Sequence, residues 1–493
     1  MPKIRIGWPG FAQVWPPFLF GICAAFGQAP VGAWFVSLPA LAALIFWVAR
    51  AARPAAAIWA AWVGGAGYFA CALNWIIEPF LIDVAAYGWM APFAVVLLAF
   101  GLALFWAAAA VVSRWAPNRA LGFALALTGA ELARGYVLTG FPWALVGHIW
   151  IDTPIAQLAA VIGPSGLTGL TLLAAALIQP RRVLPGLCAA VLLGTPWVYG
   201  LWALAQPLPA APGITLRLIQ PNAEQHLKWE PATADAFFNR LLAFTAVKPA
   251  PDLVIWPETA LPYSLTRNPE LIAVIAAAGN GAPVLLGHQR VVGTMGYNSL
   301  SLIAPAGTLG PTYDKHHLVP FGEYIPFGDL AYQWFGLTAF AAQQGNGYSA
   351  GPGPQLMDLG ARLGRVLPLI CYEAVFPQDL RGTARPDWIL QVTNDAWFGT
   401  LSGPFQHLAQ ARLRAIEQGL PLVRVANTGV TGVYDARGRE VAALEFGIAS
   451  YLDAALPGPL PPTPYARYGE MPLLVLLGGA CLLLFRARRR AVA

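Results

Sequence analysis

The chain has 493 residues, of which 57% are hydrophobic and 11% charged, whereas soluble globular domains average about 25% charged residues. This composition excludes an ordinary soluble protein and predicts an integral membrane protein with room for two or three domains. The formal net charge of +6 does not indicate a nucleic-acid partner. Residues 206–470 carry 17 Lys/Arg and 20 Asp/Glu, whereas the remainder carries 13 and 4, and no basic stripe with interleaved aromatic residues is present.

Eight apolar segments approach the ~20 residues that a helix needs to cross a bilayer. They lie near 10–27, 32–49, 57–79, 89–112, 119–138, 161–179, 183–205 and 472–486. The first segment lacks a small-residue cleavage site and is followed at once by another, so we interpret it as an uncleaved helix rather than a signal peptide. The sequence therefore predicts a polytopic α-helical membrane domain of about eight spans.

Arginine and lysine on the connecting loops predict the orientation of these spans. Basic residues occur before span 1, after span 8, and in the loops that join spans 2 and 3, spans 4 and 5, and spans 6 and 7. All of these positions fall on one side of the membrane, which the positive-inside rule makes cytoplasmic. We expect the protein to lie in the inner membrane of a bacterium, with both termini in the cytoplasm. Residues 206–470 then form a periplasmic domain between a seven-span region, 1–205, and a last span with a basic tail, 471–493.

One charged pair lies inside the membrane region. Arg134 follows Glu131 by three residues in the fifth span. The two could form an intramembrane ion pair with a functional role, or Arg134 could extend its charged end toward the membrane surface. The sequence leaves both interpretations open.

Short β-like runs alternate with helical patterns in residues 206–470 and predict an α/β domain. The expected strands lie within 214–222, 252–258, 282–290, 298–307, 365–373, 387–395 and 421–429, and the expected helices within 231–247, 268–279 and 405–419. Pro-rich segments at 206–213 and 456–472 are typical of linkers. About 260 residues suffice for one sizeable core.

Several polar residues directly follow these strands. Glu258, Cys371 and Asn394 each come after a hydrophobic run, and α/β sheets bind ligands beyond the carboxyl ends of their strands. Cys371 is the only one of five cysteines outside the long apolar segments. We interpret Asn394 and the adjacent Asp395 as residues that shape the backbone.

A thiol nucleophile at Cys371 needs a base, a nearby cation, or both. His316, His317 and His407 are available for a Cys–His arrangement, and Glu258 with Lys315 is the other option. A buried carboxylate can accept the thiol proton, and an ammonium can stabilise an oxyanion. Spacing alone does not choose between them. His316 and His317 are also possible metal ligands, but no third ligand follows at a suitable spacing, so we expect no metal.

Three motifs, "DLVIWPETALP", "YDKHHLVPFGEYIPFG" and "LICYEAVFP", resemble those of the nitrilase superfamily, whose members carry a Glu–Lys–Cys set on an αββα sandwich. The resemblance is narrowed within this superfamily by three further segments, which are "QVTNDAWFG", "QPNAEQHLKWEP" and the segment from Gly403 to Val433. With seven spans before this domain and one after it, the whole chain resembles the apolipoprotein N-acyltransferase family.

The resemblance implies roles for individual residues. Glu258 matches the general base, Lys315 the catalytic lysine and Cys371 the nucleophile. Glu323, in "PFGEYIP", matches a second essential glutamate that supports the lysine. The remaining matches are active-site positions at Tyr372 and Glu373 and a pocket-entrance tryptophan at Trp229. Residues 324–353 resemble a mobile lid only loosely, so no lid residue is assigned.

The resemblance also implies the reaction. A phospholipid, usually phosphatidylethanolamine, donates an acyl chain to Cys371, and the α-amine of a diacylated apolipoprotein accepts it, without a metal or an organic cofactor. The alternative is a membrane-tethered amidase that hydrolyses small amides. A third reading, a transporter or scaffold with a degenerate nitrilase-like domain, is disfavoured by the intact set of Glu258, Lys315 and Cys371.

Overall fold

The computed structural model describes residues 11–180, 182–325 and 347–492, and their contacts divide into two units. The helical unit comprises the chain up to Gln206 together with Phe398–Leu413 and Thr463–Ala493. The sandwich unit comprises Pro207–Trp397 and Arg414–Pro462. Residues 398–413, which the sequence placed in the exported domain, thus pack within the helical unit. The predicted lid segment lies largely outside the described residues.

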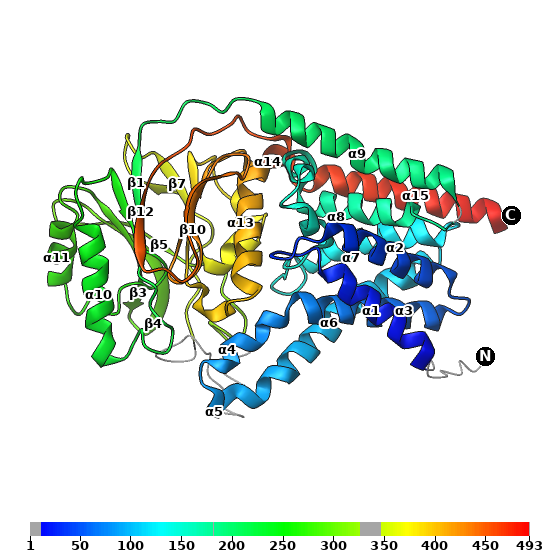
Figure 1. Cartoon of the computed structure of the whole chain (residues 1–493), viewed down its shortest axis with the longest axis horizontal. Coiled ribbons are helices and arrows are strands. Elements are labelled where there is room, and N and C mark those ends of the chain that lie inside the picture. The colour runs from blue at the N-terminus through cyan, green and yellow to red at the C-terminus, as the bar shows by residue number, and fades with distance from the viewer. Residues whose placement is uncertain (1–10, 181, 326–346, 493) are drawn as a thin grey trace. The chain divides into compact units, whose positions relative to one another are not determined.

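All eight predicted spans coincide with helices of the helical unit (Figure 1). These are α1 (Phe11–Ala25), α2 (Trp34–Arg50), α3 (Pro54–Ala72), α6 (Ala91–Ser113), α7 (Arg119–Arg134), α8 (Ala159–Leu177), α9 (Val183–Ala205) and α15 (Met471–Val492). Helix α3 packs against α1 and α6, and α8 packs against α2, α7 and α9. The short helices α4 (Glu78–Leu81), α5 (Val84–Tyr87) and α14 (Pro464–Tyr468) lie in the connections.

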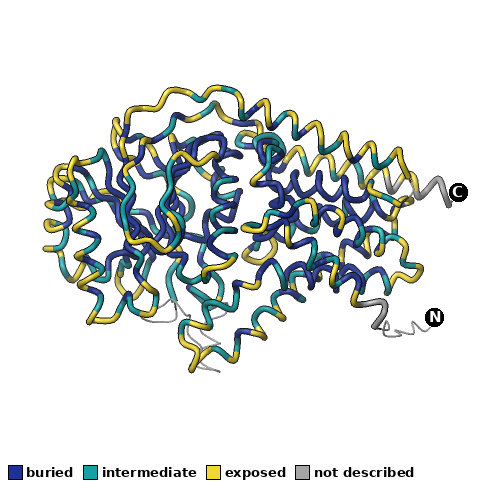
Figure 2. Tube along the Cα trace, in the orientation of Figure 1, coloured by how far each residue is buried: buried dark blue, intermediate teal, exposed yellow. Residues whose placement is uncertain are grey.

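The lengths of these helices bear on the number of spans. Within the described residues, four segments are long and apolar enough to cross a bilayer: Pro54–Ala72, Val84–Ser113, Pro154–Leu177 and Val183–Ala205. The apolar parts of α1, α2 and α15 are shorter. Most residues of helix α9 are exposed or intermediate (Figure 2), and many of the exposed ones are apolar, as in a lipid-facing helix. Membrane association is therefore supported, and a total of eight spans remains a prediction.

A kink in α8 depends on one glycine. Gly163 has φ +66° and is followed by Pro164, and a Cβ at this position would lie 2.1 Å from the ring of Tyr465. Only glycine combines a positive φ with so close an approach. The residue therefore lets α8 bend against α14.

Two six-stranded sheets form the sandwich unit. The first has the order β12-β1-β2-β3-β4-β5 and the second β11-β10-β9-β8-β7-β6. The strands are β1 (Thr215–Gln220), β2 (Leu253–Ile255), β3 (Val284–Val292), β4 (Met295–Ile303), β5 (Leu309–Asp314), β6 (Met357–Asp358), β7 (Arg365–Ile370), β8 (Trp388–Thr393), β9 (Leu422–Ala426), β10 (Thr431–Tyr434), β11 (Glu440–Leu444) and β12 (Ser450–Ala455). Every predicted strand is confirmed, whereas β5, β6 and β10–β12 were not predicted.

Helices cover the outer faces of these sheets. Helices α10 (Pro231–Thr245) and α11 (Glu270–Ala278) pack on the first sheet, and the end of α13 (Gly403–Gln418) lies beside the second (Figure 1). The apolar positions of α10 recur at helical spacing, and Phe238 and Leu241 enter a core with Trp256 and Val254. The two sheets and the helices beside them confirm the predicted α/β domain.

The parallel strands set the location of the candidate site. Strands β1, β2 and β3 are parallel to one another where they pair, as are β7, β8 and β9. In register, Ile370 of β7 pairs with Val392 of β8. Cys371 and Asn394 therefore leave neighbouring strands at the same edge, as the sequence predicted.

Candidate active site

Cys371 occupies a turn that holds its backbone in an unusual conformation. It follows β7 directly, begins the 3₁₀ helix Cys371–Val375, and has φ +53°. Non-glycine residues rarely adopt this region, and its strain is stored mostly at functional sites. The side-chain amide of Gln391 donates to the Cys371 carbonyl at 3.1 Å. The strand end and this hydrogen bond fix the position of the residue.

The Cys371 thiol is buried and surrounded by charged groups. Burial raises the pKa of the thiol well above its ordinary value, and the negative charge of Glu258 raises it further. Lys315 and a hydrogen bond with Thr393 act in the opposite direction. The resting form is therefore the thiol, so a nucleophilic role requires a base that removes its proton as it attacks.

Glu258 lies just beyond β2 and is held at both carboxylate oxygens. The side-chain amide of Asn298 donates to Oε1 at 2.7 Å, and the backbone N–H of Asn394 donates to Oε2 at 2.8 Å. Burial raises the pKa of this carboxyl, while Lys315 and the Asn298 hydrogen bond lower it. A buried carboxylate with a raised pKa and a fixed orientation is suited to accept a proton.

Lys315 follows β5 and connects two carboxylates. Its Nζ lies 2.7 Å from Oε2 of Glu323 and 3.8 Å from Oε1 of Glu258. Burial alone lowers the pKa of the ammonium, but Glu323, Cys371 and Glu258 outweigh it and raise the pKa above its ordinary value. Lys315 therefore keeps its positive charge at neutral pH and can stabilise a neighbouring thiolate or oxyanion.

Glu323 supports Lys315 from the following loop. Its Oε2 accepts from the backbone N–H of Val319 at 2.8 Å, and its Oε1 accepts from Asn298 at 3.3 Å. Asn298 thus bridges the two carboxylates that flank the lysine. The structure brings together Glu258, Lys315, Glu323 and the thiol of Cys371.

Glu373 connects the Cys371 turn to the Lys315 loop. This fully buried carboxylate accepts from the backbone N–H groups of Ile370 and His316, each at 2.7 Å, and from the hydroxyl of Tyr313 at 3.0 Å. Because its partners belong to both loops, it holds the nucleophile and the lysine in register. The ring of the adjacent Tyr372 packs edge-on against Phe376, with ring centroids 4.8 Å apart.

The histidines of the sequence analysis have other partners. His316 Nδ1 lies 2.7 Å from Glu373 Oε1, and His317 Nδ1 lies 3.1 Å from Asp379 Oδ2. His407 belongs to the helical unit and stacks on Trp143, with ring centroids 5.6 Å apart. The charged groups that act on Cys371 include Glu258 and Lys315. The geometry therefore favours the Glu–Lys option over a Cys–His pair.

His316, His317 and Asp379 also form a group of three potential metal ligands, whose ligand atoms lie within 4.8 Å of one another. Sequence spacing did not reveal Asp379, because the fold brings it from the other side of the Cys371 motif. Hydrogen bonds and ion pairs among these side chains and Glu373 account for their proximity. We derive no catalytic step from a metal at this position.

Trp229 is half-buried in the loop before α10. The ammonium of the adjacent Lys228 lies 5.4 Å from the centroid of its ring and donates to Thr259 Oγ1 at 3.0 Å. Trp229 is thereby connected to the turn that carries Glu258.

The sequence analysis contained Lys228 only as part of a motif and did not identify Asn298 as a site residue. A signal was available for Asn298, since the strand alternation of "NSLSLI" places this polar residue on the same face as Leu300 and Leu302.

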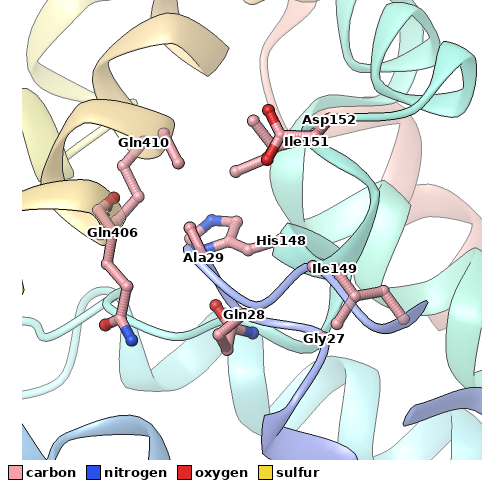
Figure 3. A pocket seen from close by; sticks show the side chains of 11 residues that line it. Gly27, Gln28, Ala29, His148, Ile149, Ile151, Asp152, Gln406 and Gln410 are labelled. Atoms are coloured by element: carbon pink, nitrogen blue, oxygen red, sulfur yellow. Dashed lines mark hydrogen bonds between the residues drawn. The ribbon is translucent and has the colours of Figure 1, made fainter. Parts of the chain in front are cut away.

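The helical unit contains a separate small pocket between the segments Gly27–Gly32, His148–Asp152 and α13 (Figure 3). Gln28, His148, Gln406 and Gln410 are among the residues that line it (Figure 3). Gln28 also donates to Tyr68 and to the carbonyl of Leu145, so the pocket belongs to a network that fixes the loop around His148. The pocket shares no residue with the Glu258–Lys315–Cys371 site.

Arg134 forms the ion pair that the sequence analysis considered. Its side chain is buried, and Nη2 lies 2.5 Å from Glu131 Oε2. The guanidinium also donates to the carbonyls of Phe141 and Trp143. The pair therefore anchors the segment after α7, and Arg134 does not extend to the surface.

Comparisons with known proteins cover both units. The model of the apolipoprotein N-acyltransferase N-terminal domain matches residues 20–177, and that of carbon-nitrogen hydrolases matches residues 215–457. The apolipoprotein N-acyltransferase of Rhodopseudomonas palustris is 37% identical over 99% of this chain and 97% of its own length. Those of Rhizobium meliloti and Caulobacter vibrioides are each 39% identical, over 92% and 93% of this chain and 91% of their own lengths.

Solved structures match about half of the chain at lower identity. A CN-hydrolase superfamily protein from Xanthomonas campestris is 21% identical over 49% of this chain and 90% of its own, with a TM-score of 0.36. An amidase from Nesterenkonia sp. is 16% identical over 55% of this chain and 99% of its own, also with a TM-score of 0.36.

Proposed function

The chain belongs to the apolipoprotein N-acyltransferase family, and from this premise we propose that it transfers an acyl chain from a phospholipid to the N-terminal amine of a diacylated lipoprotein. The observation that carries the proposal is the cluster of Glu258, Lys315 and Glu323 around the buried thiol of Cys371. A base, a permanent cation and a thiol are the groups that acyl transfer through a thioester needs.

In the first half-reaction, Glu258 takes the proton of the Cys371 thiol while sulfur attacks an ester carbonyl of the phospholipid. The carbonyl oxygen becomes an oxyanion, which Lys315 stabilises by its charge. The carbon–oxygen bond to the glycerol then breaks. The protonated Glu258 returns the proton to the leaving oxygen, so that a lysophospholipid departs and a thioester remains on Cys371.

In the second half-reaction, the α-amine of the lipoprotein attacks the thioester carbonyl. Glu258 accepts a proton from the amine as the new carbon–nitrogen bond forms, and the carbon–sulfur bond breaks. The proton returns to sulfur, which restores the resting thiol. The two substrates thus react in turn, and phosphatidylethanolamine is the donor that we expect.

The location that we propose follows from the charge pattern and the apolar helices. Long apolar helices and basic residues on one set of loops favour an inner-membrane protein with cytoplasmic termini and a periplasmic sandwich unit. The phospholipid is part of the membrane, and the lipoprotein is anchored in it by its two acyl chains. A thiol enzyme must therefore be held at the membrane surface to reach the ester of the first and the amine of the second.

The test is a transfer assay with purified full-length protein in phosphatidylethanolamine-containing micelles and a diacylated lipopeptide. We expect the lipopeptide to gain one fatty-acyl mass. A matched lipopeptide with an acetylated N-terminus should gain none, because it lacks the attacking amine.

Parallel incubation with small aliphatic amides tests the alternative. Ammonia release without any acylation of the lipopeptide would overturn the proposal in favour of a tethered amidase. Absence of both reactions in wild-type protein that is folded, as judged by its thermal unfolding, would indicate a non-enzymatic module instead.

A further inference from the structure

A second buried lysine, Lys228, contacts the turn that carries Glu258. Its side chain belongs to the segment between β1 and α10 and is only 3% exposed. The ammonium donates to Thr259 Oγ1 at 3.0 Å and lies 3.4 Å from the carbonyl oxygen of Glu258. Both acceptors are neutral groups, and both belong to the turn of the proposed base.

This turn is strained and tightly packed. Thr259 has φ +44°, a value that β-branched residues rarely adopt. A Cβ on Gly287 of β3 would lie 2.3 Å from the carbonyl oxygen of Pro257 and 2.8 Å from the Cα of Glu258. Such a backbone conformation persists only where its surroundings hold it, and Lys228 supplies two of the contacts that do so.

The comparison with Lys315 shows why Lys228 is unusual. Lys315 is equally buried, but Glu323 neutralises it at 2.7 Å. Among the described residues, Lys228 forms no ion pair, and Glu258 is the charged group that acts on it electrostatically. Burying an ammonium without a close carboxylate is costly, so its position beside the base points to a role in the chemistry.

We propose that Lys228 is a positioning residue for the base: its ammonium fixes the Glu258–Thr259 turn and keeps the Glu258 carboxylate ionised. This inference rests on the proposed function only in taking Glu258 as the base for Cys371. Lys228 acts through Glu258 and does not itself touch the reacting atoms.

The effect of Lys228 on Glu258 depends on pH. Burial lowers the pKa of Lys228 to about 8, although Glu258 opposes this shift. Lys315, Glu323 and Lys228 are the charged side chains that act on Glu258. As pH rises through the pKa of Lys228, its positive charge and its effect on Glu258 are lost. At neutral pH the charge is present and lowers the pKa of Glu258.

The experiment measures the rate at which iodoacetamide alkylates Cys371 between pH 5 and 9.5, resolved by peptide mass spectrometry in the full-length protein. Lys228→Met should slow alkylation at pH 7 by about tenfold and move the profile to higher pH, since one pKa unit corresponds to a tenfold change. Lys228→Arg keeps the charge and should stay within about threefold of wild type.

A matched control is available. Lys248→Met removes an exposed lysine of the same unit and should leave the profile unchanged. The alkylation assay contains no phospholipid or lipoprotein, so its result does not depend on acyl transfer. If the alkylation profile depends on Lys228 but the protein transfers no acyl chain, the proposed function is overturned and the inference about Lys228 stands.

Superimposable profiles for wild type and a folded Lys228→Met protein would overturn the inference. So would equal slowing by Lys228→Met and Lys228→Arg with profiles that stay parallel, because this would indicate a purely structural lysine. If Lys228→Met does not fold, Thr259→Ala removes one hydrogen-bond acceptor and leaves the charge. We expect a two- to threefold slowing at pH 7 from Thr259→Ala, and an unchanged rate would contradict the proposal.

Discussion

Two buried cation–carboxylate clusters, one in each unit, differ in what surrounds them. In the helical unit, Arg134 contacts Glu131 and two backbone carbonyls, and the indole of Trp106 donates to Glu131 at 2.9 Å. In the sandwich unit, Lys315 lies between Glu323 and Glu258, next to the thiol of Cys371. The first cluster binds groups that stabilise the fold, and the second lies beside a group that can react.

The comparison teaches that burial of charge alone does not identify a site. Each pair is close to fully buried, and each carries the cost of desolvation. The distinguishing feature is a nucleophilic side chain next to the pair: Lys315 lies beside the thiol of Cys371 and lowers its pKa, against the effect of burial. If this distinction is correct, disruption of one cluster mainly affects stability, and disruption of the other mainly affects chemistry.

The largest effect is expected at Lys315. Lys315→Met removes the cation that stabilises the oxyanion, and losing such stabilisation costs about 10²- to 10³-fold in rate. Formation of the acyl-enzyme, followed by mass spectrometry, should slow by that factor. A Lys315→Met protein with the wild-type rate of acylation would remove the basis of the comparison.

The Arg134 pair should respond in stability. Arg134→Met leaves the Glu131 carboxylate buried without its partner, which typically costs about 3–5 kcal/mol of unfolding free energy. The thermal unfolding temperature in detergent should fall, and Glu131→Gln combined with Arg134→Met should regain part of the loss. Loss of acyl transfer at an unchanged unfolding temperature would instead give Arg134 a functional role.

Asn298 allows the sandwich cluster to be weakened without removing a charge. Its hydrogen bond lowers the pKa of Glu258, which burial raises. Because the base must be ionised, the rate falls as pH drops through this pKa. Asn298→Ala should therefore move the acidic limb of Cys371 acylation to higher pH and lower the rate at pH 7 by about tenfold, since hydrogen bonds to charged groups contribute about 1.5–3 kcal/mol. An unchanged acidic limb would contradict this assignment.

The smallest effect concerns His316. Burial alone lowers the pKa of its imidazole, but Asp379 and Glu373 outweigh burial and raise it to about 9. A raised pKa stabilises the folded protein fully below the ordinary value of about 6.5. This contribution is lost as pH rises toward 9. His316→Gln should flatten the decline of the unfolding temperature over this interval, and an equally steep decline would show that His316 is not its cause.

The sequence predicted most of what positions the site. Hydrophobic runs located β2, β7 and β8, and the polar residues after them lie at one edge of the sandwich. Strand β5, with the sequence "LGPTYD", was missed because glycine and proline are poor strand formers. Strands β11 and β12 were missed because their half-exposed residues show no clear apolar alternation.

Side-chain partners were less predictable than strands. The backbone N–H of Asn394, just after the end of β8, reaches Glu258 although the two residues lie 136 positions apart in the sequence, and no local pattern encodes that approach. Asp379 near His316 and Lys228 near Thr259 are further examples of contacts that only the folded sandwich creates.

The most direct test of the account is the intact mass of the protein after incubation with phosphatidylethanolamine, for wild type and for Cys371→Ala. We predict a fatty-acyl increment on wild type alone, which neutral hydroxylamine removes because a thioester is cleaved under these conditions. An increment that persists in Cys371→Ala, or no increment on a wild-type protein that acylates the lipopeptide, would contradict the assignment of Cys371 as the acyl carrier.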